Sequence, residues 1–312
     1  MMRLKKASVV TLALLLAAAM ALAGCAAQTP AAAPTATPTA AAPTAAPTEA
    51  KTPEPAPTRV AIKTAGSTSV GPVLEALAEK YMEKHPNVEI TVEAGGSGVG
   101  VTSCGDKTVD FGMASRNLKD EEKTKYPEMK STVLCVDGVA VVVNSANPVT
   151  NLTIDQIRGI FTGTIKNWKE VGGPDQEIHK FTRDAASGTR EAFQNLMLGK
   201  NAEGKQIEID EKIFSGVYDS NGGVASAVQG DPAGVGYMSL GIVPSYQGIK
   251  SVGVDNVEAT IANMENGTYK YTRPFNLLTM GDPSGAVAEF FNYCMKDPEA
   301  VKYMQEKGYL VP

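Results

Sequence analysis

Three short runs rich in Gly, Ser and Thr hold the residues best suited to chemistry in this sequence. They are GSTSVGP at 66–72, GGSGVG at 95–100 and RDAASGTREAF at 183–193, and the third adds Arg183. Each run follows a strand-like segment and opens a helix-like one, where unpaired backbone N–H groups and the helix dipole favour negative charge. Small residues let an anion approach such a turn closely. Together the runs predict one shared anion pocket.

The segments around these runs alternate between strand and helix patterns. Residues 60–65, 88–92 and 109–113 predict strands, and 72–84 predicts an amphipathic helix with Ser69 as its N-cap. A β-α-β-α-β order implies parallel strands joined by right-handed crossovers. Ligands of such sheets lie at the carboxyl ends of the strands, which is where the runs fall.

Further along the chain, the patterns predict a second set of elements. The nearly continuous apolar run 133–143 indicates a buried strand or a strand that passes between two lobes. A capping box at 153–156 predicts the start of a helix. A short strand is expected at 234–240, and helices at 284–296 and 298–307.

The first 59 residues read as a targeting and linker region. Basic residues precede an apolar stretch at 9–22, which is typical of a secretion signal, and Leu-Ala-Gly-Cys25 resembles the bacterial lipoprotein processing box. We therefore predict a signal peptide at 1–24 and a lipidated Cys25 that opens a tether at 25–59. A plain signal peptide with a chance Cys is the alternative. Residues 26–58 hold 13 Ala, 8 Pro and 8 Thr, a composition that cannot build a packed core.

The charge and the cysteines narrow the class of function. Five basic and two acidic residues precede Val60, so 24 of the 29 basic and 32 of the 34 acidic residues remain, a net charge of −8. This balance argues against nucleic acid or an anionic membrane surface as partner. Cys104, Cys135 and Cys294 form no metal-binding pattern, and we predict no metal or cofactor. Buried free thiols are expected, with a Cys104–Cys135 disulfide as the alternative.

Eight motifs occur in the order found in one known family. They are GSTSVGPVLEALAEKY (66–81), GSGVG (96–100), VDFGMASR (109–116), GVAVVVN (138–144), LTIDQIRGIFTGTIKNW (152–168), RDAASGTREAF (183–193), GVGYMSL (234–240) and YTRPFNLLT (271–279). Over almost all of 60–312 the chain thus resembles the phosphate-binding proteins of bacterial phosphate ABC importers.

The resemblance implies a fold and a function. The fold is α/β, a type II-like periplasmic-binding-protein fold in which each lobe has a central, mostly parallel sheet flanked by helices, with a two-strand hinge. Lobe 1 would comprise 60–140 and 240–312, and lobe 2 would comprise 141–239. The protein would be a monomeric, lipid-anchored receptor on the extracytoplasmic face of the cell membrane. It would capture inorganic phosphate and deliver it to a membrane permease, without cofactor or nucleic acid.

The resemblance also implies the ligand-binding residues. Around a single phosphate it places Thr68, Ser69, Ser97, Ser115, Arg183, Ser187, Gly188 and Thr189. Their chemistry suits the task, because dehydrated phosphate needs many donors and Arg183 can bind two of its oxygens. Some members of the family have a carboxylate where Ser115 falls, which can accept the proton of monohydrogen phosphate. Asp110, Asp184 or a hydroxyl are the open alternatives for that acceptor.

Other functions remain as alternatives. Another tetrahedral oxyanion, such as sulfate or molybdate, would suit the same donors, and Ser187 could serve a phosphatase or hydrolase. No catalytic triad is visible, because the sequence has only His85 and His179, and Ser97 lacks a GxSxG frame. The loop at 199–206 departs from a nucleotide-binding P-loop. We therefore predict no catalytic residues.

Four conspicuous side chains near these motifs are expected to be structural. Arg116 and Arg190 are predicted to form ion pairs close to the cleft, since most charged side chains are not ligands. Trp168 and Tyr237 are predicted to pack in the core.

Overall fold

The structure is a computed structural model, and it describes residues 59–312. The predicted signal peptide and, except for Arg59, the tether that begins at Cys25 lie outside the described residues. Between 59 and 312 no helix combines the length and the apolar character needed to cross a membrane.

The described chain alternates between strands and helices, as the sequence patterns predict. The strands are β1 (Val60–Gly66), β2 (Val88–Ala94), β3 (Phe111–Ala114), β4 (Met129–Asn144), β5 (Asn151–Leu152), β6 (His179–Arg183), β7 (Gly216–Tyr218), β8 (Gly234–Ser239), β9 (Ile249–Ser251), β10 (Gly253–Val254) and β11 (Thr272–Met280). The α-helices are α1 (Gly71–Lys84), α2 (Ser97–Gly105), α3 (Asp120–Lys125), α4 (Ile154–Thr162), α5 (Gly188–Phe193), α6 (Asn221–Gln229), α7 (Ile261–Glu265), α8 (Gly285–Lys296) and α9 (Pro298–Glu306). Short turns of other helix types complete the chain at η1 (Trp168–Val171), η2 (Gln194–Leu198), η3 (Glu211–Ile213) and η4 (Leu240–Ser245).

One long sheet path connects most of the strands, in the order β2-β1-β3-β11-β4-β8-β6-β7, with β9 also paired to β4. β1 pairs in parallel with both β2 and β3, so the predicted β-α-β-α-β unit is confirmed. β6 likewise pairs in parallel with β7 and β8. The carboxyl ends of β1, β2 and β3 therefore lie at one edge, where the Gly- and Ser-rich turns follow them.

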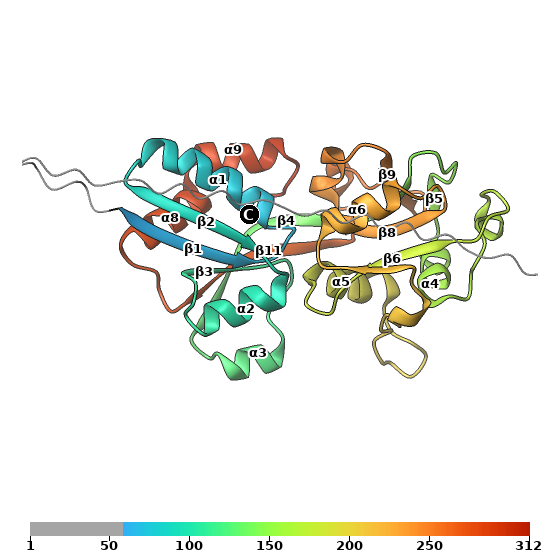
Figure 1. Ribbon diagram of the computed structural model, residues 1–312, viewed down its shortest axis with the longest axis horizontal. Helices are drawn as coiled ribbons and strands as arrows, with labels where there is room; N and C mark the ends of the chain where they lie inside the picture. The colour runs from blue at the N-terminus through green and yellow to red at the C-terminus, as the bar shows by residue number, and fades with distance from the viewer. Residues whose placement is uncertain (1–58) are drawn as a thin grey trace, which may run out of the picture. The chain divides into compact units, whose positions relative to one another are not determined.

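β4 and β11 run antiparallel and side by side between two groups of elements (Figure 1). Leu134 and Cys135 of β4 are buried in a core with α1, α8 and α9, which we call lobe 1. The run from Val139 to Val143 of the same strand is buried in a second core with α4, α5 and α6, which we call lobe 2. The apolar run at 133–143 is thus a strand between two lobes, and it continues at both ends to span 16 residues.

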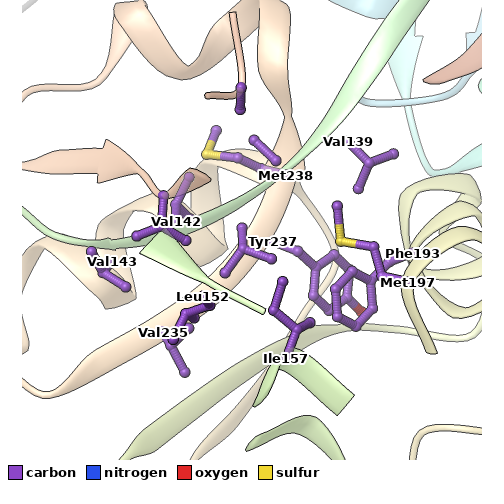
Figure 2. Packing of buried hydrophobic residues seen from close by; sticks show 14 of the residues in the cluster. Val139, Val142, Val143, Leu152, Ile157, Phe193, Met197, Val235, Tyr237 and Met238 are labelled. Atoms are coloured by element: carbon purple, nitrogen blue, oxygen red, sulfur yellow. The ribbon is translucent and has the colours of Figure 1, made fainter. Parts of the chain in front are cut away.

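The core of lobe 2 is aromatic as well as aliphatic (Figure 2). The rings of Phe193 and Tyr237 stack with centroids 4.1 Å apart. Trp168 is fully buried, and its indole N–H donates to the Ala233 carbonyl at 2.9 Å. The predictions that Trp168 and Tyr237 pack in the core are confirmed.

The structure adds detail to two other expectations. Cys104, Cys135 and Cys294 are buried free thiols, so the disulfide alternative is wrong. The buried side chains between 242 and 271 pack in the core of lobe 2, so the prediction that all of 240–312 belongs to lobe 1 is wrong for this segment. The chain returns to lobe 1 only with β11.

Candidate anion-binding site

The turn after β1 presents its hydroxyls differently from the sequence prediction. Ser67 Oγ accepts the N–H groups of Ser69 and Val70 at 3.2 and 3.4 Å. The N-cap of α1 is Val70, and no side chain caps this helix, so the prediction of Ser69 as N-cap is wrong. Because Ser67 already satisfies the turn, the Ser69 hydroxyl is available for contacts outside it.

A second pair of hydroxyls follows β2 and β3. Gly96 precedes α2 with φ of 89°, a conformation that favours glycine, and Ser97 begins the helix. Ser115, directly after β3, donates its N–H to Ser97 Oγ at 3.0 Å, and the two Oγ atoms lie 3.3 Å apart. Both side chains are fully buried. The parallel pairing of β1 with β2 and β3 brings this pair to the same sheet edge as Ser69.

In lobe 2 the SGT turn follows β6. Ser187 is the N-cap of α5, and its Oγ accepts the Arg190 N–H at 3.1 Å. Gly188 lies directly against lobe 1, because a Cβ on this residue would be 2.2 Å from Ser97 Oγ and 2.7 Å from Ser115 Oγ. Only glycine permits this approach.

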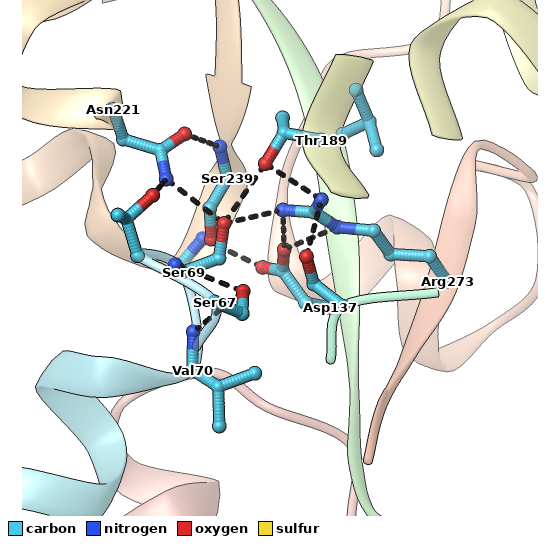
Figure 3. A network of polar contacts seen from close by, with 12 residues as sticks. Ser67, Ser69, Val70, Asp137, Thr189, Asn221, Ser239 and Arg273 are labelled. Carbon is cyan, nitrogen blue, oxygen red and sulfur yellow. Dashed lines mark hydrogen bonds and ion pairs between the residues drawn. The ribbon is translucent and has the colours of Figure 1, made fainter. Parts of the chain in front are cut away.

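The two lobes meet through hydroxyl and amide groups (Figure 3). Ser69 Oγ of lobe 1 lies 2.9 Å from Thr189 Oγ1 of lobe 2. Asn221, at the start of α6, donates through Nδ2 to Ser69 Oγ at 2.9 Å and to Thr68 Oγ1 at 3.2 Å. Together with Gly188, these contacts gather six of the predicted residues at one place, namely Thr68, Ser69, Ser97, Ser115, Gly188 and Thr189.

Arg183, at the end of β6, has an unusual environment. Its side chain is fully buried, and Nε and one terminal nitrogen donate to the carbonyls of Tyr218 and Asp219 at 3.2 and 2.8 Å. Its other terminal nitrogen, Nη1, is buried without a partner among the described residues. Burial lowers the pKa of this guanidinium to about 10, and the positive charge of Arg273 adds to the lowering. A buried cationic donor without an acceptor is costly, so this group suits an anion.

The structure reveals three polar residues that sequence reasoning missed: Asp137, Asn221 and Arg273. Arg273 of β11 lies directly opposite Asp137 of β4, and an Nη2–Oδ2 contact of 3.0 Å joins them. Burial raises the pKa of the Asp137 carboxyl, and the charge of Arg273 opposes that shift. The position of Asp137 inside an apolar strand could have indicated this pair, because a charged residue there is rarely buried without a partner.

Ion pairs surround the hydroxyl cluster. Arg116 of lobe 1 contacts Glu122 at 2.6 Å and Glu191 of lobe 2 at 3.1 Å, and Lys119 also reaches Glu191 at 3.4 Å. Arg190 pairs with Glu211. The ion pairs predicted for Arg116 and Arg190 are therefore confirmed, and Glu191 adds a charged link between the lobes.

A cavity of about 380 Å³ lies beside Ser187. Lys119 of lobe 1 and Arg190 and Glu191 of lobe 2 contribute to its walls. Its lining is mostly polar or charged, so it suits a hydrated or charged solute better than an apolar one.

The candidates for a phosphate proton acceptor separate in the structure. Asp110 precedes β3 and accepts the Lys63 N–H at 2.8 Å, so it lies at the opposite end of that strand from Ser115. Asp184 directly follows Arg183, and its Oδ1 is buried without a hydrogen-bond partner among the described residues. Of the two carboxylates, only Asp184 remains beside the site.

Comparisons with known proteins identify the class of protein to which this chain belongs. A family model described as a PBP superfamily domain matches residues 37–298. The phosphate-binding protein PstS of Bacillus subtilis is 30% identical over 248 residues, which cover 79% of each chain. PstS of Borreliella burgdorferi is 28% identical over 251 residues, covering 78% of this chain and 88% of the relative.

Solved structures agree. A crystal structure of a substrate-binding protein from Clostridium perfringens with bound phosphate is 35% identical, with a TM-score of 0.71, and the match covers 81% of this chain and 99% of the other. An ABC-type phosphate transport receptor from Vibrio cholerae is 36% identical, with a TM-score of 0.63 over 81% and 100% of the two chains. The chain therefore belongs to the PBP superfamily and, within it, to the family of the phosphate-binding protein PstS. The two-lobed periplasmic-binding-protein fold expected from the sequence is confirmed.

Proposed function

We propose that this protein is a receptor that captures inorganic phosphate between its lobes and delivers it to the permease of an ABC importer. The observation that carries the proposal is the buried Arg183 guanidinium, whose Nη1 has no partner among residues 59–312. The members of its family compared above are phosphate-binding proteins by name, and one of the matching structures holds phosphate.

The proposed ligands are the eight residues expected from the sequence. Arg183 would bind phosphate oxygens through its guanidinium, and Thr68, Ser69, Ser97, Ser115, Ser187 and Thr189 would donate their hydroxyl protons. Because Gly188 has no side chain, its backbone would allow the anion to approach closely. Because residues 60–312 carry a net charge of −8, attraction must come from such local donors rather than from the overall field.

Binding would be coupled to closure of the lobes. Thr68, Ser69, Ser97 and Ser115 belong to lobe 1, and the remaining donors belong to lobe 2. An anion that contacts both sets stabilises the arrangement in which both are within reach.

We further propose that the mature protein is a monomer held on the extracytoplasmic face of the membrane by lipid on Cys25. The support for the lipid anchor is the basic and apolar sequence before Leu-Ala-Gly-Cys25 and the Ala/Pro/Thr tether that follows. Metabolic labelling with palmitate tests this: the native chain should incorporate label and a Cys25→Ser chain should not. Label in the Cys25→Ser chain would refute the anchor.

Titration calorimetry and melting temperature test the ligand. Phosphate should bind and raise the melting temperature, whereas equal concentrations of sulfate or molybdate should raise it less. Stabilisation by sulfate equal to that by phosphate would end the phosphate assignment and favour a general oxyanion binder.

We propose no enzymatic activity. His179 begins β6, and its Nδ1 lies 2.6 Å from a carboxylate oxygen of Asp231. Arg183 ends the same strand, about 13 Å from His179. His85 stacks on Tyr81 at the end of α1. Neither imidazole is therefore placed to activate Ser187. Hydrolysis of a generic phosphate ester that disappears in a Ser187→Ala variant would contradict this statement.

A further inference from the structure

The guanidinium of Arg273 contacts three of the proposed phosphate ligands (Figure 3). Nη1 donates to Thr189 Oγ1 at 2.8 Å and to Ser115 Oγ at 3.3 Å, and Nη2 donates to Ser69 Oγ at 3.0 Å. Nε and Nη2 also donate to Asp137 Oδ2 at 3.2 and 3.0 Å. These contacts occupy all of the N–H groups that a guanidinium has. Arg273 therefore has no donor left for a ligand of its own.

The contacts fix the direction of the hydroxyl protons. A hydroxyl has one proton and two lone pairs, so an oxygen that accepts from a guanidinium must give its own proton to another acceptor. Ser69 is the strictest case, because its Oγ accepts from both Arg273 and Asn221. Both lone pairs are then taken, so the Ser69 proton can only be donated, either to Thr189 Oγ1 at 2.9 Å or to an anion that replaces this contact.

We propose that Arg273 is a positioning residue that holds the hydroxyls of Ser69, Ser115 and Thr189 as donors to the bound anion. The proposal rests on the proposed function, and it adds a group that acts on phosphate only through other side chains. Ser69 and Ser115 belong to lobe 1 and Thr189 to lobe 2, so this orientation is complete only when the lobes lie as they do in the structure.

Asp137 keeps Arg273 in place. Its Oδ2 accepts from the guanidinium, and its Oδ1 accepts the Gly241 N–H at 3.1 Å. The two residues are direct neighbours across β4 and β11, at the point where these strands pass between the lobes. Both side chains are almost completely buried. Loss of the Arg273 charge alone would leave the buried Asp137 carboxylate unpaired, so a test must keep the net charge of this pair at zero.

Two variants separate orientation from charge. Arg273→Lys keeps one positive charge beside Asp137, but an ammonium on a flexible stem cannot bond all three hydroxyls and the carboxylate in the same plane. Arg273→Met combined with Asp137→Asn removes both charges. Arg158→Met is the control for the loss of an arginine away from the hydroxyls. Arg158 also pairs with a carboxylate, but its other acceptors are backbone carbonyls within lobe 2.

The measurement is the phosphate dissociation constant of the full chain by titration calorimetry, with the melting temperature as the check on folding. We expect both Arg273 variants to weaken phosphate binding by about tenfold or more, and the control by less than about twofold. Phosphate affinity of Arg273→Lys within about twofold of the native value would overturn the proposal, because charge alone would then suffice.

A double-mutant cycle with Thr189→Val gives a second readout, which a purely structural role would not move. Valine removes the hydroxyl and keeps the shape of the side chain. If Arg273 acts through this hydroxyl, Thr189→Val should cost much less affinity in the Arg273→Lys background than in the native chain. Equal costs in both backgrounds would overturn the proposal. This cycle needs only the charge-conserving variant, so it stands even if the neutral double variant does not fold.

The failure of this inference can be told apart from the failure of the proposed function. A native chain that binds no phosphate would overturn both. A native chain that binds phosphate, with Arg273→Lys binding it equally well, would overturn the positioning role alone.

Discussion

The hydroxyl oxygens of Ser69 and Thr189 lie 2.9 Å apart, although 120 residues separate them along the chain. Ser69 follows β1 in lobe 1, and Thr189 lies in the first turn of α5 in lobe 2. Two turns that are each an ordinary feature of an α/β unit thus meet at one place. Variants of the residues that meet there distinguish those that bind the anion from those that hold the lobes together.

The Arg183→Ala variant should lose most of its phosphate affinity. A charge-assisted, two-oxygen contact is worth about 2 kcal/mol or more, so the dissociation constant should rise by roughly 30-fold or more. Titration calorimetry measures it, with Arg158→Ala as a control for the loss of an arginine elsewhere in lobe 2. Near-native phosphate affinity in Arg183→Ala would contradict the placement of this residue in the site.

The Gly188→Ala variant should fold but bind phosphate poorly. Its new Cβ would lie 2.2 Å from Ser97 Oγ, so the lobes could not approach as they do in the structure. The matched control is Gly98→Ala, whose Cβ would meet its nearest atom, Ala186 Cα, at an ordinary 3.6 Å. Calorimetric affinity that is equal in the two variants would show that the Gly188 contact does not matter for binding.

The Glu191→Gln variant should weaken phosphate binding modestly and make it less sensitive to salt. Glu191 of lobe 2 pairs with Arg116 and Lys119 of lobe 1, and partly exposed pairs of this kind contribute about 0.5–1 kcal/mol. Glu211→Gln is the control, because Glu211 pairs with Arg190 inside lobe 2. Affinities measured at low and high salt test this. The same salt dependence in Glu191→Gln as in the native chain would argue against an electrostatic link between the lobes.

The thiols of Cys104, Cys135 and Cys294 should be unreactive in the native protein. All three are buried, and burial raises the pKa of each thiol, which keeps them protonated at neutral and mildly alkaline pH. A Cys25→Ser chain should therefore show almost no reaction with a chromogenic thiol reagent at pH 8 until denaturant is added. Three thiols should then react. Rapid reaction of any of them without denaturant would show that its region opens readily.

The local elements were predictable because their signals are local. The strand β1, the helix α1 and the capping box of α4 each follow from residues within one or two turns, and the structure contains them. The Ser69 cap was wrong for the same reason: three consecutive Ser and Thr residues compete for one turn, and the spacing cannot tell which one satisfies it.

The missed part of the site depends on long-range pairing. Arg273 and Asp137 are 136 residues apart and meet only because β11 pairs with β4 in one particular register. Asn221 reaches Ser69 across the lobes, 152 residues away. No periodicity near these residues encodes such contacts. The sequence also could not show that the chain returns to lobe 1 at β11 rather than at 240, because an apolar segment can pack in either core.

β4 also links the stabilities of the two halves of the protein. Leu134 and Cys135 fill the interior of lobe 1, and a few residues later Val139 to Val143 fill that of lobe 2. Unfolding of either lobe would therefore disrupt β4, which is also part of the core of the other lobe. Residues 59–312 should accordingly denature in a single cooperative transition instead of two, so that a ligand held by both halves protects the whole at once.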